Sequence, residues 1–321
     1  MQFLTSPIDR RRVLGTAAAS ALSVFGGASF AQSSNRVLRI GYQKGWLSLI
    51  KNRGSLEKRL APLGVAVSWT EFNAGPVQLE ALNVGSIDFG DVGEAPPIFA
   101  QAAGAPLVYA AATVPRPRLE GLLVPKDAKI QSVAELKGKR IALNKGSNVH
   151  YMLVQLLRKN GLQYSDVTPI FLPPPDARAA FEKGAVDAWA IWDPFLAAAQ
   201  KTLDARLLAD ASGVANNRQY YFSSRDYASK NPDVLKIAIA EIDAIDSWVG
   251  ANKAAAAAEL SQVLGLEKRI TELYIGRVAF GTKVVNADIL AEQQAIADTF
   301  LELQLIPKKL NLRHAAPVNL G

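Results

Sequence analysis

Residues 85–97 read Gly85-Ser86-Ile87-Asp88-Phe89-Gly90-Asp91-Val92-Gly93-Glu94-Ala95-Pro96-Pro97, and the rest of the chain is organised around them. Apolar residues alternate with small or acidic ones from Ile87 to Val92, which predicts a buried strand. The two prolines precede an apolar run suited to a helix, because a proline in the first turn needs no N–H partner. A strand, a glycine turn and a helix start leave backbone N–H groups free, and these attract an anion. The stretch therefore predicts half of a binding cleft for a small oxyanion.

A second stretch repeats this order further along the chain, as Gly184-Ala185-Val186-Asp187-Ala188-Trp189-Ala190-Ile191-Trp192-Asp193-Pro194. Both copies run from glycine through an aliphatic residue and an aspartate to a strand, a proline and a helix. One interpretation is that both are ordinary units of a single sheet. We favour two similar lobes that face each other.

Two segments are suited to carry the chain between lobes. Residues 114–120 contain alternating prolines, which forbid a helix and favour extended backbone. Residues 219–224 are aromatic and strand-like, which suits a return crossing. We therefore expect lobe 1 to comprise residues 36–117 and 223–321, and lobe 2 residues 118–222.

The first residues are typical of an export signal. A basic Arg10-Arg11-Arg12 is followed by a moderately apolar segment and by small residues up to Ala31, which predicts a signal peptide over residues 1–31. The arginine run resembles the twin-arginine signal, with a Sec signal as the alternative. No other apolar run approaches the roughly 20 residues of a membrane span. Without cysteine the chain can form neither a disulfide nor a lipid anchor, and we expect a soluble periplasmic protein.

Composition argues against several classes of function. The formal net charge is +7, but the basic residues are scattered, which disfavours a nucleic-acid site. Two histidines and no cysteine cannot build a histidine-rich metal site. Because G-x-S-x-G, H-E-x-x-H and P-loop patterns are missing from the sequence, we expect no catalysis and no cofactor.

The expected strand ends supply the candidate ligand-binding groups, namely Gln43, the N–H groups of Gly93 and Glu94, and Ser147 with Asn148. Charge-assisted hydrogen bonds of about 1.5–3 kcal/mol each, with help from helix termini, can reach the roughly −8 kcal/mol of a micromolar ligand. On this interpretation no lysine or arginine is needed in the pocket.

Two tryptophans are candidates to cover the organic part of a ligand. Trp46 follows a glycine in the first loop, with a surface-loop tryptophan as the alternative, and Trp192 stands before Asp193-Pro194, with core packing as the alternative. Trp189 lies on the opposite face of its strand from Trp192 if the period of two holds, so we assign it to packing. Glu94 and Asp193 lie at the ligand ends of their strands and could serve a ligand or cap a helix.

The other polar candidates have structural alternatives. His150 lies one turn into a helix beside Ser147, as a ligand residue or as a structural histidine. Asp88 and Asp187, at strand starts, are expected to make structural hydrogen bonds. Arg116 and Arg118 are expected to be solvated hinge charges.

Several segments together resemble the aliphatic sulfonate-binding proteins of ABC importers. They are Ile40-Gly41-Tyr42-Gln43-Lys44-Gly45, residues 81–88, residues 96–104, Lys145-Gly146-Ser147, residues 187–194 and Ile306-Pro307-Lys308-Lys309. The resemblance implies an α/β, two-lobe periplasmic-binding-protein fold of type II, with two crossovers and a ligand cleft between the lobes. It also implies that Gln43, Gly93, Glu94, Ser147, Asn148 and His150 surround the sulfonate, while Trp192 and Asp193 face its organic tail. The chain departs from the pattern at Asn148 and Val149, where related sequences often have serines.

The resemblance implies a receptor that delivers sulfonates to an ABC permease and its ATPase as a sulfur source, and we expect it to be a monomer. Taurine- and nitrate- or bicarbonate-binding proteins are related alternatives. A rival of another class is an enzyme on the same fold, such as a pyrimidine-precursor synthase. Those enzymes rely on several histidines and a reactive lysine, and this chain does not have the histidines.

Overall fold

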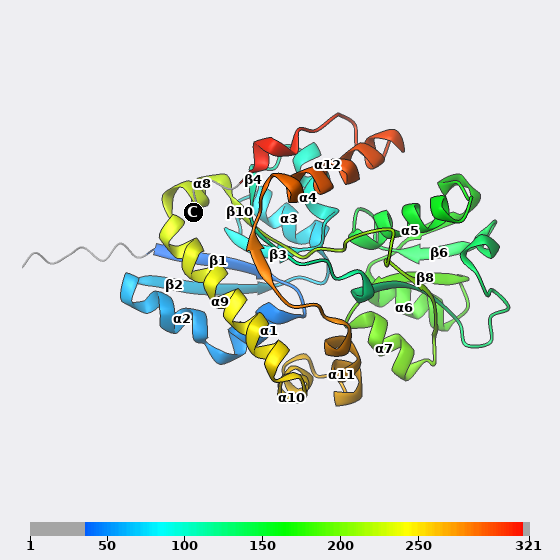
Figure 1. The fold of residues 1–321 in the computed structure, drawn as a ribbon, viewed down its shortest axis with the longest axis horizontal. Coiled ribbons are helices and arrows are strands. Elements are labelled where there is room, and N and C mark those ends of the chain that lie inside the picture. Colours follow the sequence, from blue (N-terminus) through cyan, green and yellow to red (C-terminus); the bar gives the residue numbers. More distant parts are fainter. Residues whose placement is uncertain (1–35, 317–321) are drawn as a thin grey trace, which may run out of the picture. The chain divides into compact units, whose positions relative to one another are not determined.

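The computed structural model describes residues 36–316, so the signal-peptide prediction lies outside the described residues. Within them the strands form two sheets (Figure 1): a six-stranded sheet in the order β11-β4-β10-β3-β1-β2, and a five-stranded sheet in the order β7-β6-β8-β5-β9. The strands are β1 (Arg36–Tyr42), β2 (Val65–Glu71), β3 (Phe89–Val92), β4 (Leu107–Thr113), β5 (Glu120–Val124), β6 (Arg140–Leu143), β7 (Thr168–Phe171), β8 (Ala188–Trp192), β9 (Arg206–Asp210), β10 (Tyr220–Ser224) and β11 (Thr282–Val284).

Helices connect the strands in both sheets. The α-helices are α1 (Trp46–Arg53), α2 (Ser55–Leu60), α3 (Gly75–Asn83), α4 (Pro96–Ala102), α5 (Asn148–Lys159), α6 (Pro174–Glu182), α7 (Phe195–Thr202), α8 (Arg225–Lys230), α9 (Pro232–Ala251), α10 (Lys253–Leu264), α11 (Lys268–Arg277) and α12 (Ala287–Glu302). Short 3-10 helices are η1 (Ala61–Leu63), η2 (Pro117–Leu119), η3 (Val133–Leu136), η4 (Tyr164–Asp166) and η5 (Leu312–Ala315). Between residues 36 and 316 no helix combines the length and the apolar character needed to cross a membrane.

The chain passes between the sheets twice. It leaves the six-stranded sheet after β4, reaches β5 of the other sheet through η2, and returns between β9 and β10. β10 then inserts antiparallel between β3 and β4. The interpretation of a single sheet is therefore wrong, and the predicted α/β fold with two sheets and two crossovers is confirmed.

Apolar side chains cover both faces of each sheet. On the six-stranded sheet, β1 packs with α1, α9 and α10 in one core, while α3, α4 and α12 contribute to a second core. On the five-stranded sheet, α5 belongs to one core and α6 and α7 to another. Burial on both faces explains why the strands read as apolar runs.

The repeated motif is also a structural repeat. β1 pairs in parallel with β3, and β6 pairs in parallel with β8. The backbone N–H of Asp88 donates to the carbonyl of Arg39 at 2.8 Å, and that of Asp187 donates to the carbonyl of Arg140 at the same distance. Each carboxylate accepts the N–H of the same arginine in return, at 3.0 Å and 2.7 Å. The structural roles predicted for both aspartates are confirmed.

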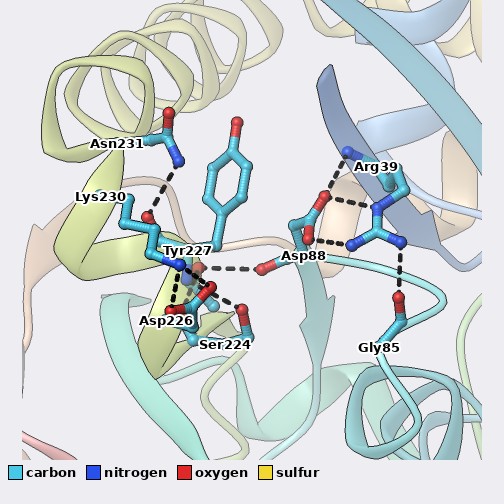
Figure 2. A network of polar contacts seen from close by, with 9 residues as sticks. Arg39, Gly85, Asp88, Ser224, Asp226, Tyr227, Lys230 and Asn231 are labelled. Atoms are coloured by element: carbon cyan, nitrogen blue, oxygen red, sulfur yellow. Dashed lines mark hydrogen bonds and ion pairs between the residues drawn. The ribbon is translucent and has the colours of Figure 1, made fainter. Parts of the chain in front are cut away.

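We call this pair of reciprocal hydrogen bonds between an aspartate and an arginine the clamp, and Figure 2 shows its first copy, Asp88 with Arg39. The Arg39 guanidinium donates to both carboxylate oxygens of Asp88, at 2.8 Å and 2.6 Å, and to the carbonyl of Gly85. In the second copy, Arg140 reaches Asp187 and the carbonyl of Gly184 at longer distances, 3.3 Å and 3.4 Å. In both copies the aspartate ties the start of one strand to its parallel neighbour, which directs the opposite, carboxyl ends of the strands to the same edge.

Candidate functional site

A cavity of about 80 Å³ lies at these carboxyl ends, lined by residues from both sheets. Gln43 follows β1, Gly93 follows β3 and Trp192 ends β8. The first turns of α1 and α5 also reach the cavity. In open α/β sheets, the crevice outside the carboxyl ends of the strands is where ligands bind.

Most of the candidate ligand-binding residues that the sequence suggested line this cavity. Its lining includes Gln43, Trp46, Gly93, Ser147, Asn148, Trp192 and Asp193, but neither Glu94 nor His150. The lining also includes residues that sequence reasoning missed, among them Lys44, Asp91, Arg116, Asn217, Gln219, Tyr221 and Tyr274.

Trp46 is buried, so the alternative of a surface-loop tryptophan is wrong for this residue. Its indole is 4% exposed and stacks on the Tyr274 ring, with centroids 5.2 Å apart and planes at 10°. Its Nε1 has no hydrogen-bond partner in the described part of the chain. A buried donor without a partner costs free energy, so a ligand acceptor at this point would be stabilised.

The start of α5 is held by polar contacts that use up its side-chain donors. Ser147 stands at the N-cap and its hydroxyl donates to the carbonyl of Asn144 at 2.7 Å. The Asn148 side-chain amide donates to Glu120 Oε2 and, at 3.0 Å, to Asn217 Oδ1. The hydroxyl and amide hydrogens expected to meet an anion are therefore committed to the protein. What α5 offers an anion is the backbone N–H groups of its first turn.

Gly93, after β3 of one sheet, lies close to Asn148 at the start of α5, which follows β6 of the other sheet. A Cβ added at this position would lie 2.9 Å from Cγ of Asn148. Contacts this short do not occur for real Cβ atoms, so any other residue would push α5 away from the end of β3.

Asp193 has the capping role that the sequence left open. Its Oδ1 accepts the N–H of Ala197 in the first turn of α7 at 2.8 Å, and Arg277 forms an ion pair with its carboxylate at 2.8 Å. Burial raises the pKa of Asp193 to about 6 even though Arg277 lowers it. Trp192 is half-buried at the cavity wall, edge-on to Phe195.

The prediction that Arg116 is a solvated hinge charge is wrong. Its side chain is 4% exposed, lines the cavity, and pairs with Asp246 of α9 at 2.6 Å. The sequence interpretation needed no lysine or arginine in the pocket, whereas Lys44 and Arg116 both line it. One signal could have found the pair, since Asp246 interrupts the apolar stripe of α9 and a buried carboxylate demands a cation. Arg118 is exposed, as predicted.

Glu94 and His150 are not part of the cavity lining. Glu94 is 1% exposed, accepts the N–H of Arg218 at 3.2 Å, and has its pKa raised to about 7 by burial. His150 accepts the N–H of Gly146 on Nδ1 at 3.3 Å, and its Nε2 lies 2.7 Å from the Tyr164 hydroxyl. Burial lowers the pKa of His150 to about 4, so the ring is neutral. His150 therefore has the structural role that was its alternative.

Asp91 lines the cavity but was not a candidate from the sequence, and its side chain lacks a hydrogen-bond partner at one oxygen among the described residues. It is 5% exposed, and its Oδ2 accepts a hydrogen bond from Gln219 Nε2 at 2.9 Å. Its Oδ1 is buried and finds no partner among residues 36–316. Burial raises the pKa of Asp91 to about 7, against the lowering effects of the Gln219 side chain and of the backbone N–H groups of Gln43 and of Asp91 itself.

Comparison with known proteins shows the family to which this chain belongs. A model described as NMT1/THI5 like matches residues 63–243. The chain belongs to the NMT1/THI5-like family. Within this family, the aliphatic sulfonates-binding protein of Escherichia coli (strain K12) is 43% identical over 306 residues, covering 94% of this chain and 95% of its own length.

Two solved structures of the family agree with this fold. The periplasmic aliphatic sulphonate binding protein SsuA from Escherichia coli superposes with a TM-score of 0.81 at 42% identity, covering 90% of this chain and 94% of its own. The alkanesulfonate-binding protein SsuA from Xanthomonas axonopodis pv. citri, bound to MOPS, superposes with a TM-score of 0.84 at 41% identity, covering 87% and 97%. The resemblance to aliphatic sulfonate-binding proteins is confirmed, and these relatives are binding proteins.

Proposed function

We propose that this chain is the solute-binding receptor of an ABC importer and captures aliphatic sulfonates. The observation that carries the proposal is the cavity at the carboxyl ends of both sheets, in a chain 43% identical to an aliphatic sulfonates-binding protein over nearly its full length. The cavity joins backbone donors, an unpartnered indole N–H and aromatic walls, which suits a ligand with an anionic head and an apolar tail.

The ligand that the cavity can enclose is small. A water molecule needs about 10–15 Å³ of such space, so about 80 Å³ holds roughly five to eight non-hydrogen atoms. Methanesulfonate and ethanesulfonate fall in that range. We place the sulfonate at the first turn of α5 and near Trp46 Nε1 and Gln43, with the tail against Trp192.

Capture proceeds by closure of two lobes on the ligand. We assign residues 36–117 and 223–321 to lobe 1 and residues 118–222 to lobe 2, connected by the two crossovers. Gly93 against Asn148 and Arg277 against Asp193 are then contacts between the lobes. Gly93, Asn148 and Asp193 line the cavity, so closing the lobes and enclosing the ligand are one event.

The protein works in the periplasm, exported by the segment 1–31 with its twin-arginine-like Arg10-Arg11-Arg12. Its relatives include periplasmic proteins, which supports this location. It acts as a monomer that hands the sulfonate to a membrane permease driven by an ATPase, and it is not an enzyme. Neither a cofactor nor a metal has a part in this mechanism.

Thermal denaturation with a panel of anions tests the proposal. A ligand that binds only the folded protein raises its melting temperature by mass action. We expect ethanesulfonate to raise it more than taurine, nitrate, sulfate or bicarbonate. The buffer must contain no sulfonate, which rules out MOPS and its relatives. A shift with nitrate or bicarbonate alone would move the protein to the related binding classes, and no shift with ethanesulfonate would refute the proposal.

A further inference from the structure

Asp91 lines the cavity proposed to hold an anion, and one of its carboxyl oxygens has no hydrogen-bond partner among the described residues. It lies on β3, two residues before Gly93, with its side chain in the cavity lining. Gln219 occupies Oδ2, while Oδ1 is buried and without a hydrogen-bond partner in the described chain. An acceptor of this kind is complemented by a donor, whereas a sulfonate brings only acceptors.

The charged groups around Asp91 do not neutralise it. Arg116 is paired with Asp246 at 2.6 Å, and Arg277 with Asp193 at 2.8 Å. Lys44 lines the cavity with an exposed side chain that forms no ion pair with another described residue. The phenols that face Asp91 are Tyr221, its partner on β10, and Tyr274 from α11. Burial raises the pKa of both, so both stay neutral near pH 7.

We propose that Asp91 enters the sulfonate complex as a neutral acid. A proton on Oδ1 is donated in a hydrogen bond to a sulfonate oxygen, so that capture of the anion takes up a proton from the solvent in every molecule whose Asp91 was ionised before binding. This inference rests on the proposed function and adds to it a proton-linked binding step at a residue that sequence reasoning did not single out.

Electrostatics favours this protonation state. Two unit charges about 4 Å apart repel strongly in protein surroundings, enough to weaken binding roughly a thousandfold. A sulfonate is the anion of a strong acid and keeps its charge, so the proton goes to the carboxylate. Burial already raises the pKa of Asp91 to about 7 in the empty protein, so protonation is easily reached at neutral pH.

The same reasoning identifies the ligand class. A simple alkanesulfonate, with a negative charge and no donor, requires the neutral acid. An aminosulfonate whose ammonium reached Asp91 would stabilise the carboxylate instead, and its binding would release rather than take up a proton. The sign of the proton exchange therefore distinguishes the two kinds of sulfonate.

Isothermal titration calorimetry of the full mature protein with ethanesulfonate tests the inference. Titrations at pH 7 in phosphate and in imidazole, which differ in ionisation enthalpy, give the number of protons exchanged. We expect the wild type to take up about half a proton at pH 7 and nearly one at pH 8, and to bind about tenfold more weakly at pH 8 than at pH 6. This measurement needs no variant.

Variants assign the proton to its residue. Asp91→Asn keeps the size of the side chain and should abolish proton uptake, with affinity that is flat from pH 6 to pH 8. Glu94→Gln is the matched control, because Glu94 also has a pKa raised to about 7 but does not line the cavity. It should retain the proton uptake of the wild type.

The outcomes separate the two proposals. Binding of ethanesulfonate with no proton uptake in either buffer, or uptake that persists in Asp91→Asn, overturns the role of Asp91 and leaves the sulfonate receptor standing. No binding of ethanesulfonate even at pH 6 overturns the receptor, and the inference with it.

Discussion

Arg277 and Asp193 form a buried ion pair although 84 residues separate them along the chain. Nη1 of Arg277 lies 2.8 Å from Oδ2 and 3.1 Å from Oδ1 of Asp193, and the two side chains are 7% and 0% exposed. Arg277 ends α11, whereas Asp193 follows β8 of the five-stranded sheet. The pair thus connects the cavity wall to a helix that is distant in sequence.

Arg277→Met should destabilise the protein by about 3–5 kcal/mol near neutral pH, because it leaves a buried carboxylate unpaired. Without the arginine the pKa of Asp193 rises further above about 6. A carboxyl whose pKa is higher in the folded than in the unfolded chain favours folding at low pH, and this contribution is lost as pH rises through the folded pKa. Urea denaturation should therefore show a smaller loss at pH 5 than at pH 8.

Arg269→Met is the matched control for that experiment. Arg269 lies on the same helix, but its ion pair with Glu267 is exposed, at 56% and 58%. Exposed pairs contribute at most about 1 kcal/mol. An equal loss of unfolding free energy in the two variants, or a loss at Arg277 that does not change with pH, would contradict the buried pair.

Trp46→Phe should weaken ethanesulfonate binding about five- to thirtyfold and leave the free protein as stable as the wild type, or slightly more so. The phenyl ring can still stack on Tyr274, while the Nε1 donor, unpartnered among the described residues, is removed. Trp69→Phe is the control, since Trp69 Nε1 donates to Glu57 at 2.7 Å far from the cavity lining. Trp69→Phe should lower the free energy of unfolding and leave the affinity for ethanesulfonate unchanged. Calorimetry and urea denaturation measure both quantities, and unchanged affinity in Trp46→Phe would remove Trp46 from the site.

Gly93→Ala should reduce ligand affinity at least tenfold, because the added Cβ meets Asn148 at 2.9 Å and holds α5 away from β3. Gly276→Ala adds the same methyl group where no described atom lies within 4 Å, inside α11. Alanine is the better helix former by up to about 1 kcal/mol, so this control should keep its affinity and gain stability. Titration of both variants with ethanesulfonate decides whether the close approach is needed for binding.

The repeated clamp predicts unequal costs for equivalent substitutions. Asp88→Asn should destabilise the protein more than Asp187→Asn, because Asp88 is 6% exposed with short bonds to Arg39, while Asp187 is 31% exposed with longer bonds to Arg140. Hydrogen bonds to charged groups contribute about 1.5–3 kcal/mol when buried, and exposed ion pairs less. Urea denaturation gives the two values. Equal losses would mean that burial does not distinguish the copies.

The local order of residues was sufficient to predict the repeated motif and the residues that lie at the strand ends. Asp88 and Asp187 stand at the same place in two similar motifs, and each bonds its strand neighbour as that order predicts. The candidates Gln43, Gly93, Ser147 and Trp192 follow or end strands, or start a helix, and the structure brings them to one cavity. Chain neighbours set these positions, because parallel strands with helical crossovers direct all their carboxyl ends to the same edge.

Contacts with distant parts of the chain determine the direction in which each of these side chains points. Glu94 follows Gly93 directly, yet its carboxylate accepts the backbone N–H of Arg218 and it does not line the cavity. His150 is held by Tyr164, which lies 14 residues away, and Arg116 is held by Asp246, which lies 130 residues away. Asp246, which interrupts the apolar stripe of α9, signals that a cation is needed but not which one, and the contacts of Glu94 and His150 leave no periodic trace in the sequence. These residues were therefore assigned wrongly or left open.

The sequence by itself thus determined the two α/β units, the crossings between them and the edge at which a ligand would bind, because period, turn residues and helix starts are local properties. Only the tertiary structure decided which polar atoms remain free at that edge. Partners distant in the sequence accept the amide hydrogens of Asn148 and pair with the charge of Arg116, while Trp46 Nε1 and Asp91 Oδ1 have no hydrogen-bond partner in the described chain. The physical reason is that a polar atom is satisfied or left free by whatever folds against it, and folding brings those neighbours from every part of the chain.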